Sequence, residues 1–131
     1  VADLDRAVEL GSKSPETYYN RAMGRAGLGQ SEYALNDFDR AIELRSDYVD
    51  ARYNRGLLHA HASRLDAALR DFDRVLELRK DHYSSYHCRG LIRVASKNIV
   101  GAREDFRAAL RFAPQNWEFR AALEKKLSEL E

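Results

Sequence analysis

Apolar and charged residues alternate along the chain at helical spacing, and the pattern recurs with a fixed period. The eight residues that begin at Asp37 are DFDRAIEL, and related octets begin at Asp3, Asp71 and Asp105, each 34 residues after the one before. A fixed period of this length is typical of stacked repeats, in which each unit packs only on its neighbours, rather than of a single globular core. The sequence therefore predicts a helical repeat array.

Turn and capping residues divide the array into helical hairpins. Ser14 followed by Pro15 predicts an N-cap and a first-turn proline, and Gly29 predicts a break between two helices. Further N-caps are expected at Ser31, at Ser46 or Asp47, at Ser63 with Asp66 as a capping box, at Asp81 and at Asn98. The helices expected from these signals cover about 15–28, 31–45, 49–62, 64–79, 83–96 and 99–112.

The two ends of the chain differ from the repeating middle. Val1, Leu4, Ala7, Val8 and Leu10 have helical spacing and are followed by a stop at Gly11, but no partner helix precedes them. The chain is therefore expected to be a piece of a longer array, with weak self-association through this apolar end. The segment from Trp117 is expected to be a capping helix with an apolar face of Phe119, Leu123, Leu127 and Leu130 and a charged face of Glu118, Arg120, Glu124, Lys125 and Glu129.

Small and aromatic residues in register make the repeat resemble the tetratricopeptide repeat family. The matching sets are Ala22, Gly56 and Gly90; Ala34, Ala68 and Ala102; Phe38, Phe72 and Phe106; and the closing proline Pro114. The early aromatic is present as Tyr18 and Tyr86 but is replaced by Arg52, and the later tyrosine is replaced by Arg25, His59 and Arg93.

The resemblance implies an all-α, right-handed α-solenoid of helix-turn-helix repeats with a C-terminal capping helix. The expected layout is one domain over residues 1–131. It comprises the second helix of a truncated repeat at 1–14, repeats at 15–48, 49–82 and 83–116, and the capping helix at 117–131.

Composition narrows the classes of function. The 131 residues are 44% hydrophobic, which suits a single packed domain, and no apolar run approaches the ~20 residues that span a bilayer. A net charge of +1 gives no general attraction to nucleic acid. The only cysteine, Cys88, excludes an internal disulfide, and no signal peptide is recognisable, so a reducing, cytoplasmic location is expected.

The resemblance also implies a concave groove lined by the first helix of each hairpin. The residues expected to line it are Tyr19, Asn20, Met23, Tyr53, Asn54, Leu57, His61, His87, Cys88 and Leu91. Such a groove binds an extended peptide or a partner helix, so the expected function is a non-catalytic adaptor, scaffold or co-chaperone. Two alternatives stay open: the Tyr and Asn side chains satisfy one another or water, or the chain is a structural segment that self-associates through its ends.

Other chemistries find little support in the sequence. The family's clamp for chaperone tails consists of lysines, an arginine and asparagines, and at its positions this chain has Tyr19, Met23, Asn54, Ser84 and Cys88. Only Asn54 matches, so the charges needed to hold a carboxylate are missing. His59 with His61, and His87 with Cys88, lack the spacing of three or four that places two metal ligands on one helix face. No nucleophile with its base, paired-carboxylate site or phosphate loop is recognisable, so no cofactor, metal or enzymatic activity is expected.

Arginine and aspartate recur together where the family usually has leucine at the arginine position. Arg21, Arg55 and Arg89 each precede an aspartate by 16 residues, which predicts the pairs Arg21 with Asp37, Arg55 with Asp71 and Arg89 with Asp105. An anion-binding row is the alternative, because Arg25 and Arg93 lack an equally clear acid.

Overall fold

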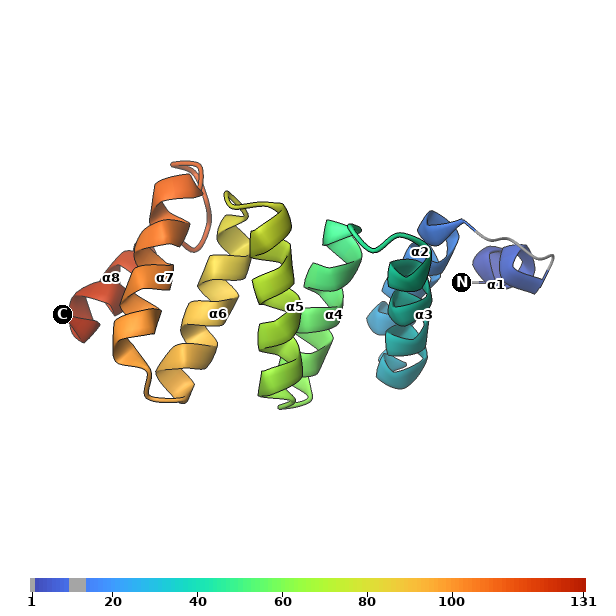
Figure 1. The fold of residues 1–131 in the computed structure, drawn as a ribbon, viewed down its shortest axis with the longest axis horizontal. Coiled ribbons are helices and arrows are strands. Elements are labelled where there is room, and N and C mark those ends of the chain that lie inside the picture. The colour runs from blue at the N-terminus through green and yellow to red at the C-terminus, as the bar shows by residue number, and fades with distance from the viewer. Residues whose placement is uncertain (1, 10–13) are drawn as a thin grey trace. The chain divides into compact units, whose positions relative to one another are not determined.

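The computed structural model describes residues 2–9 and 14–131 and is all-helical within them (Figure 1). Its eight helices are α1 (Ala2–Glu9), α2 (Pro15–Gly27), α3 (Ser31–Leu44), α4 (Val49–His61), α5 (Leu65–Leu78), α6 (Tyr83–Ala95), α7 (Ile99–Phe112) and α8 (Arg120–Leu130). Every predicted helix is present, most of them one residue shorter at an end. The capping helix begins at Arg120 and not at Trp117.

Several predicted caps are wrong, although the helices they were meant to open exist. Ser14 is the N-cap residue of α2 as predicted, but its hydroxyl donates to the Glu16 carboxylate at 2.7 Å and makes no cap hydrogen bond. Ser31 already lies inside α3, and Tyr48 and His82 occupy the N-cap positions expected for Ser46 or Asp47 and for Asp81. Asn98 is confirmed, because its Oδ1 accepts from the Gly101 N–H at 3.1 Å.

The turn inside each hairpin uses a left-handed residue at the repeat period. Gly29 has a φ of 77°, and Ser63 and Lys97 have φ values of 61° and 64°. Ser63 therefore lies in a turn and does not open the capping box that the sequence suggested. Only the first of these turns has the residue that adopts this conformation without steric cost.

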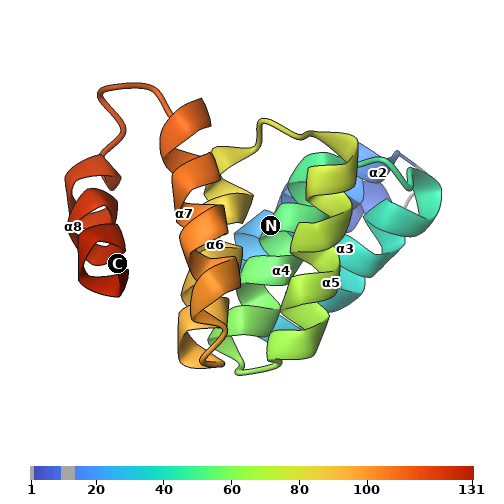
Figure 2. The same ribbon diagram turned by 60° about the vertical axis from the view of Figure 1, so that its left-hand side comes forward.

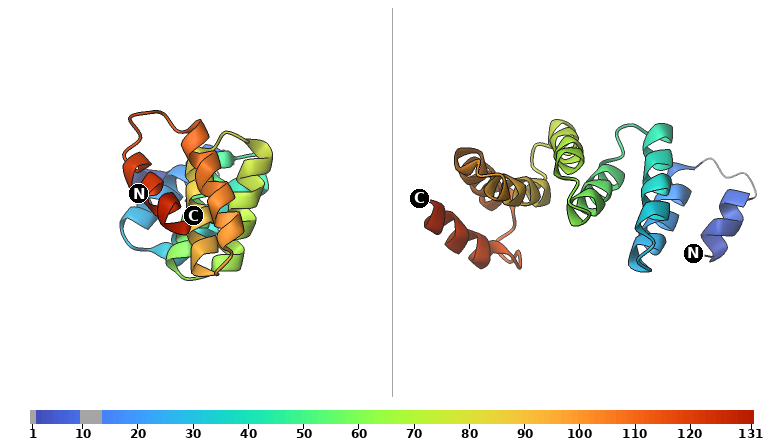
Figure 3. Two further views of the ribbon diagram at one scale, coloured as in Figure 1. Left: turned by 90° about the vertical axis from the view of Figure 1, so that its left-hand side faces the viewer. Right: turned by 90° about the horizontal axis from the view of Figure 1, so that it is seen from below.

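The chain forms two compact units, Val1–Ala68 and Leu69–Glu131. In the first unit, α2 packs against α3, and α3 against α4, around a buried cluster of alanines, an isoleucine and two aromatic rings. Its fully buried members include Phe38, Ala22, Ala34, Ala41 and Ala51. The α2–α3 hairpin is antiparallel and α1 contacts α2 (Figure 3).

The structure describes only part of the N-terminal apolar segment that was predicted to self-associate. Leu4 and Val8 of α1 are half-buried, while Val1, Leu10 and Gly11 lie outside the described residues. Self-association through this end stays a prediction.

In the second unit, α6 and α7 form a hairpin around Phe106, and α8 lies beside α7 (Figure 2). Leu123 is buried, and Leu127 and Leu130 pack on the same cluster, as the apolar face of the capping helix requires. Phe119 is an exception, because it precedes α8 and is largely exposed.

Arg120 does not lie on a solvated charged face as predicted. Its Nη2 donates to the carbonyls of Ala113 at 2.7 Å and Leu110 at 3.0 Å. These carbonyls lie at the end of α7, where a helix leaves its last acceptors without partners. Arg120 therefore fastens the start of α8 to the end of α7.

Candidate functional site

A small apolar cavity lies between α2 and α4 in the first unit. Its volume is about 190 Å³, and Met23, Asn54, Leu57 and His61 from the predicted groove set all line it. Ala26, Phe38 and Leu58 complete the lining. Met23 is 42% exposed, so the mouth of the cavity presents an apolar side chain to solvent.

Tyr19 of α2 and Asn54 of α4 are joined by a hydrogen bond on this face. The Asn54 Nδ2 donates to the Tyr19 hydroxyl at 3.2 Å and to the Asp50 carbonyl at 2.8 Å. The Tyr19 ring packs on Phe38 and Tyr48 with centroids 5.9 and 5.1 Å apart. Burial raises the pKa of Tyr19, and the charges of Asp50 and Tyr48 add to the shift. In this pair, a tyrosine and an asparagine satisfy each other's hydrogen-bonding groups, as the alternative reading of the sequence expected.

The other predicted residues of this face are less engaged with the cavity. Asn20 is exposed on α2, and Tyr53 is half-buried on α4, but neither lines it. Four residues of the predicted set therefore line one cavity, and Asn20 and Tyr53 are outside its lining.

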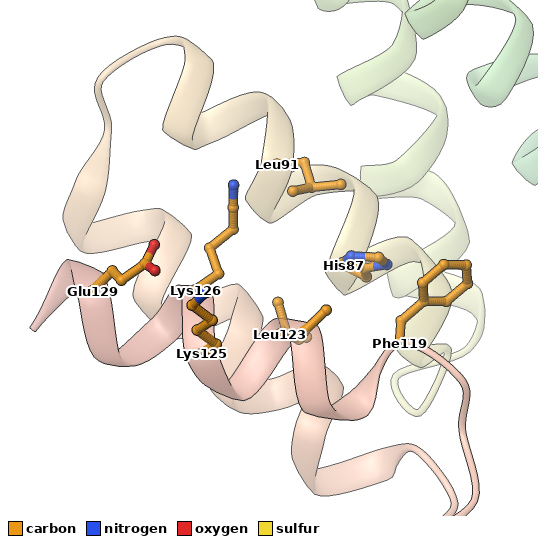
Figure 4. Close-up of a pocket in the computed structure, with 8 residues that line it drawn as sticks. His87, Leu91, Phe119, Leu123, Lys125, Lys126 and Glu129 are labelled. Carbon is orange, nitrogen blue, oxygen red and sulfur yellow. The ribbon is translucent and has the colours of Figure 1, made fainter.

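A second cavity, of about 320 Å³, lies between α6 and α8 in the second unit (Figure 4). His87 and Leu91 from the predicted set line it, and Cys88 does not. The His87 ring contacts Trp117 and Phe119 with centroids 5.2 and 5.4 Å apart. The segment that leads into α8 therefore covers part of the α6 face that was predicted to be open.

The residues that α8 contributes to this cavity were missed as site residues. They are Ala122, Leu123, Lys125, Lys126 and Glu129, with Phe119 just before the helix. Leu123 and Phe119 had been assigned to stacking, and Lys125 and Glu129 to a solvated face. The sequence signal that could have identified this cavity is the boundary between the apolar and the charged face of the capping helix, where leucines lie next to lysines.

Burial, with the positive charge of Lys126 nearby, lowers the pKa of His87. The unfolded chain, with an ordinary histidine pKa near 6.5, therefore takes up this proton before the folded chain does. Stability from this group is complete above about pH 6.5 and is lost as the pH falls towards the folded-state pKa.

Acidification below about pH 6.5 is accordingly expected to destabilise the chain through His87. Denaturant unfolding of the wild type and of His87→Asn across this range measures the effect. The three other histidines are present in both proteins, so the difference between the two curves isolates His87. Parallel curves would contradict the assignment.

The predicted ion pairs of Arg21 and Arg89 are confirmed. Arg21 donates from Nη2 and Nε to the two oxygens of Asp37 at 2.7 and 2.8 Å. Arg89 donates from Nη2 to the buried Asp105 at 2.8 Å, with Nε at 3.1–3.2 Å from both of its oxygens. Hydrogen bonding to Asp37 raises the pKa of Arg21. Burial opposes the charged form of Arg89, but the hydrogen bonds that it donates to Asp105 and Asp73 outweigh this effect and raise its pKa.

Arg25 and Arg93 have acids after all, because each shares the aspartate of its neighbour. Arg25 Nη1 lies 3.1 Å from Asp37, and Arg93 Nη1 lies 2.9 Å from Asp105. These two arginines therefore do not support an anion-binding row. The third predicted pair, Arg55 with Asp71, joins residues of the two separately described units and stays a prediction.

A second set of aspartates follows the same spacing in the opposite direction and was missed. Asp5, Asp39 and Asp73 each precede an arginine by 16 residues and pair with it, as Asp5 with Arg21 at 3.3 Å, Asp39 with Arg55 at 2.9 Å and Asp73 with Arg89 at 2.8 Å. In the last octet this position is Arg107, which pairs with Glu131 at 3.0 Å. We call the arginines at this period, together with the aspartates 16 residues before and after them, the arginine–aspartate ladder.

Comparison with known proteins identifies the family. A model described as Tetratricopeptide repeat matches residues 19–85 and 64–117, which together make up more than half of the chain. The chain belongs to the tetratricopeptide repeat family. A sequence comparison with curated proteins finds no match.

Solved tetratricopeptide repeat structures resemble the chain over most of its length. The Arabidopsis OM64 TPR domain is 24% identical with a TM-score of 0.80, covering 88% of this chain and 95% of that one. The first TPR of Spaghetti, bound to an HSP90 peptide, is 19% identical with a TM-score of 0.79, at 90% and 93% coverage. YrrB, a TPR protein with an unusual peptide-binding site, is 26% identical with a TM-score of 0.80, and the match covers 94% of this chain and 62% of YrrB.

Two further observations apply to the described part of this tetratricopeptide repeat chain. Its histidines, cysteine and carboxylates nowhere gather in a group of three that could hold a metal ion. None of the helices that the structure describes has the length and apolar character needed to cross a membrane.

Proposed function

We propose that the chain is a non-catalytic protein-interaction module that binds an extended peptide or a partner helix at the α2–α4 face of its first unit. The observation that supports this most is the cavity beside Met23 and Leu57, which is the size of an aliphatic side chain and has a polar group in its wall. The module would serve as an adaptor, a scaffold or a co-chaperone in a reducing compartment.

Asn54 supplies the polar contact. Its Nδ2 already donates to Tyr19 and Asp50, while no donor among the described residues reaches its Oδ1. An amide oxygen beside an apolar cavity can accept a backbone N–H of a bound peptide, as its side chain enters the cavity. Tyr19 fixes the orientation of this amide because it accepts from the other end.

The relatives support peptide binding as the mode of interaction. The Spaghetti repeat domain is bound to an HSP90 peptide, and YrrB is described as having a peptide-binding site. The tail clamp remains disfavoured here, because Tyr19 and Met23 stand at two clamp positions without matching them and take part in an aromatic cluster and an apolar cavity instead.

Peptides selected from a display library on the wild-type chain provide the test. Replacing both Tyr53 and Asn54 with alanine is expected to weaken the binding free energy of a selected peptide by about 1 kcal/mol or more, as measured by calorimetry, because interface energy concentrates at a few such side chains. Tyr33→Ala is the matched control, since Tyr33 is an exposed tyrosine of α3 outside the cavity. Equal affinity for both variants, with circular dichroism unchanged, would overturn the proposal.

A further inference from the structure

The α6–α8 cavity has an apolar floor that the fold leaves uncovered. Leu91 of α6 is 39% exposed and Phe119 is 46% exposed, although both lie against buried Leu123. In Figure 4 the side chains of His87, Leu91, Leu123 and Phe119 face the space between the two helices. Its volume of about 320 Å³ has room for a leucine-sized side chain and part of a backbone.

The rim of this cavity carries more positive than negative charge. Lys125 and Lys126 line it together with a single acid, Glu129, and the Lys126 side chain extends from α8 across the space (Figure 4). Two nearby acids that do not line the cavity pair with arginines, Glu124 of α8 with Arg120 and Glu131, which follows the helix, with Arg107. Within the described residues, neither lysine forms an ion pair.

His87 adds an imidazole whose polar atoms are open to a ligand. Its ring is held edge-on by Trp117 and tilted against Phe119, but among the described residues no hydrogen bond is made by its nitrogens. Burial lowers the pKa of the ring, and the nearby charge of Lys126 lowers it further. A carboxylate placed beside Lys126 would offset the effect of that charge and could accept a hydrogen bond from the ring.

We propose that the α6–α8 cavity is a second docking site, which takes an acidic peptide segment with an aliphatic side chain against Leu91 and Phe119 and a carboxylate beside Lys126. The site goes beyond the α2–α4 face in both location and chemistry. The two unpaired lysines give the charge complementarity, and the exposed floor requires an apolar group in the same ligand. A basic peptide would bring like charges to Lys125 and Lys126, and a nucleic acid would find too few cations and no apolar match.

Trp117 is a built-in probe of this site. It is the only tryptophan of the chain, and its ring lies 5.2 Å from His87 and 5.7 Å from Phe119 between centroids. Titration of the full chain with a short acetylated peptide of leucine and glutamate is expected to give a saturable change in tryptophan emission. The same peptide with glutamine in place of glutamate is expected to bind at least about tenfold more weakly, because it loses the charge-assisted contact.

Substitutions then identify the lysine that contacts the carboxylate. Lys126→Glu is expected to lower the affinity for the glutamate peptide by about tenfold or more, and the milder Lys126→Gln is expected to lower it less. Lys97→Glu makes the same change of charge at an exposed turn of the same unit and is expected to leave affinity near wild type. Leu91→Ser should lower the affinity for both the glutamate and the glutamine peptide, since it removes an apolar contact and not a charge.

The proposal is wrong if tryptophan emission does not respond, if the glutamine peptide binds equally well, or if Lys126→Glu and Lys97→Glu have the same effect. Unchanged far-ultraviolet circular dichroism establishes that each variant is folded. A failure here, with Tyr53 and Asn54 still required for the library-selected peptides, rejects only the second site. The reverse pattern rejects the α2–α4 face and retains the acidic-peptide site.

Discussion

Replacing Asp105 with alanine is expected to lower the free energy of unfolding by about 3–5 kcal/mol. The Asp105 carboxylate is almost completely buried and accepts hydrogen bonds from both Arg89 and Arg93. Its removal leaves the Arg93 guanidinium without its acid and Arg89 with Asp73 alone. Urea unfolding followed by circular dichroism measures the loss.

Asp73→Ala is the matched control, because Asp73 belongs to the same ladder and also pairs with Arg89, at 2.8 Å. Its side chain is 52% exposed, against 3% for Asp105, so water screens the pair and can replace the lost contact. The expected loss is about 1 kcal/mol or less. If the two variants lost equal stability, burial would not be what makes Asp105 important.

The ladder gives Arg21 and Arg89 two acids each, at equal distance along the chain. Arg21 lies between Asp5 and Asp37, and Arg89 between Asp73 and Asp105. One acid comes from the same hairpin and the other from the preceding second helix. A buried arrangement of this kind restricts which helix faces can meet, because a shifted helix would leave a charge without its partner. This can specify helix register even where a leucine would contribute more to stability.

Much of the fold could be predicted because the period repeats the same information. Phe38, Phe72 and Phe106 recur with small residues at constant spacing, so one helical hairpin, once recognised, fixes the position of the next. All three rings are fully buried. The caps were less predictable because several side chains can satisfy the same helix end, and His82 does so here through its Nδ1, which accepts from Ser85.

The site was predicted only in part, for reasons specific to its residues. Leu57 and His61 line one cavity because they are four residues apart on one face of α4, and Met23 of α2 joins them at the position one period before Leu57. The contribution of Lys126 and Phe119 could not be read from any repeat, since α8 has no counterpart elsewhere in the chain to set its register. Asp73 was missed for a simpler reason: the predicted pairs joined each arginine only to the acid that follows it, although the preceding acid lies equally close in sequence.

Phe106→Ala is expected to cost about 3–5 kcal/mol, because it empties the centre of the second unit's core. Phe112→Ala is the control: its ring is 40% exposed and stacks on Tyr86 at 6.0 Å, so about 1 kcal/mol or less is expected. The comparison is made by urea unfolding. Similar losses at both sites would mean that the α6–α7 core is not centred on Phe106.

Gly90 extends this prediction, because the Phe106 ring occupies the space that a side chain at Gly90 would need. A Cβ added there would lie 2.6 Å from Phe106 Cδ1 and still closer to Cε1. Ala22 holds the same register position in the first unit beside fully buried Phe38, so a methyl group can be accommodated when the helices are spaced for it. Gly90→Ala is therefore expected to cost about 1–3 kcal/mol in the wild type.

In a Phe106→Leu background the clash is relieved, and the higher helix propensity of alanine, about 1 kcal/mol, should make Gly90→Ala neutral or stabilising. The double-mutant cycle measures this coupling directly. A cost for Gly90→Ala that is the same in both backgrounds would show that the Phe106 ring is not what requires a glycine at this helix crossing.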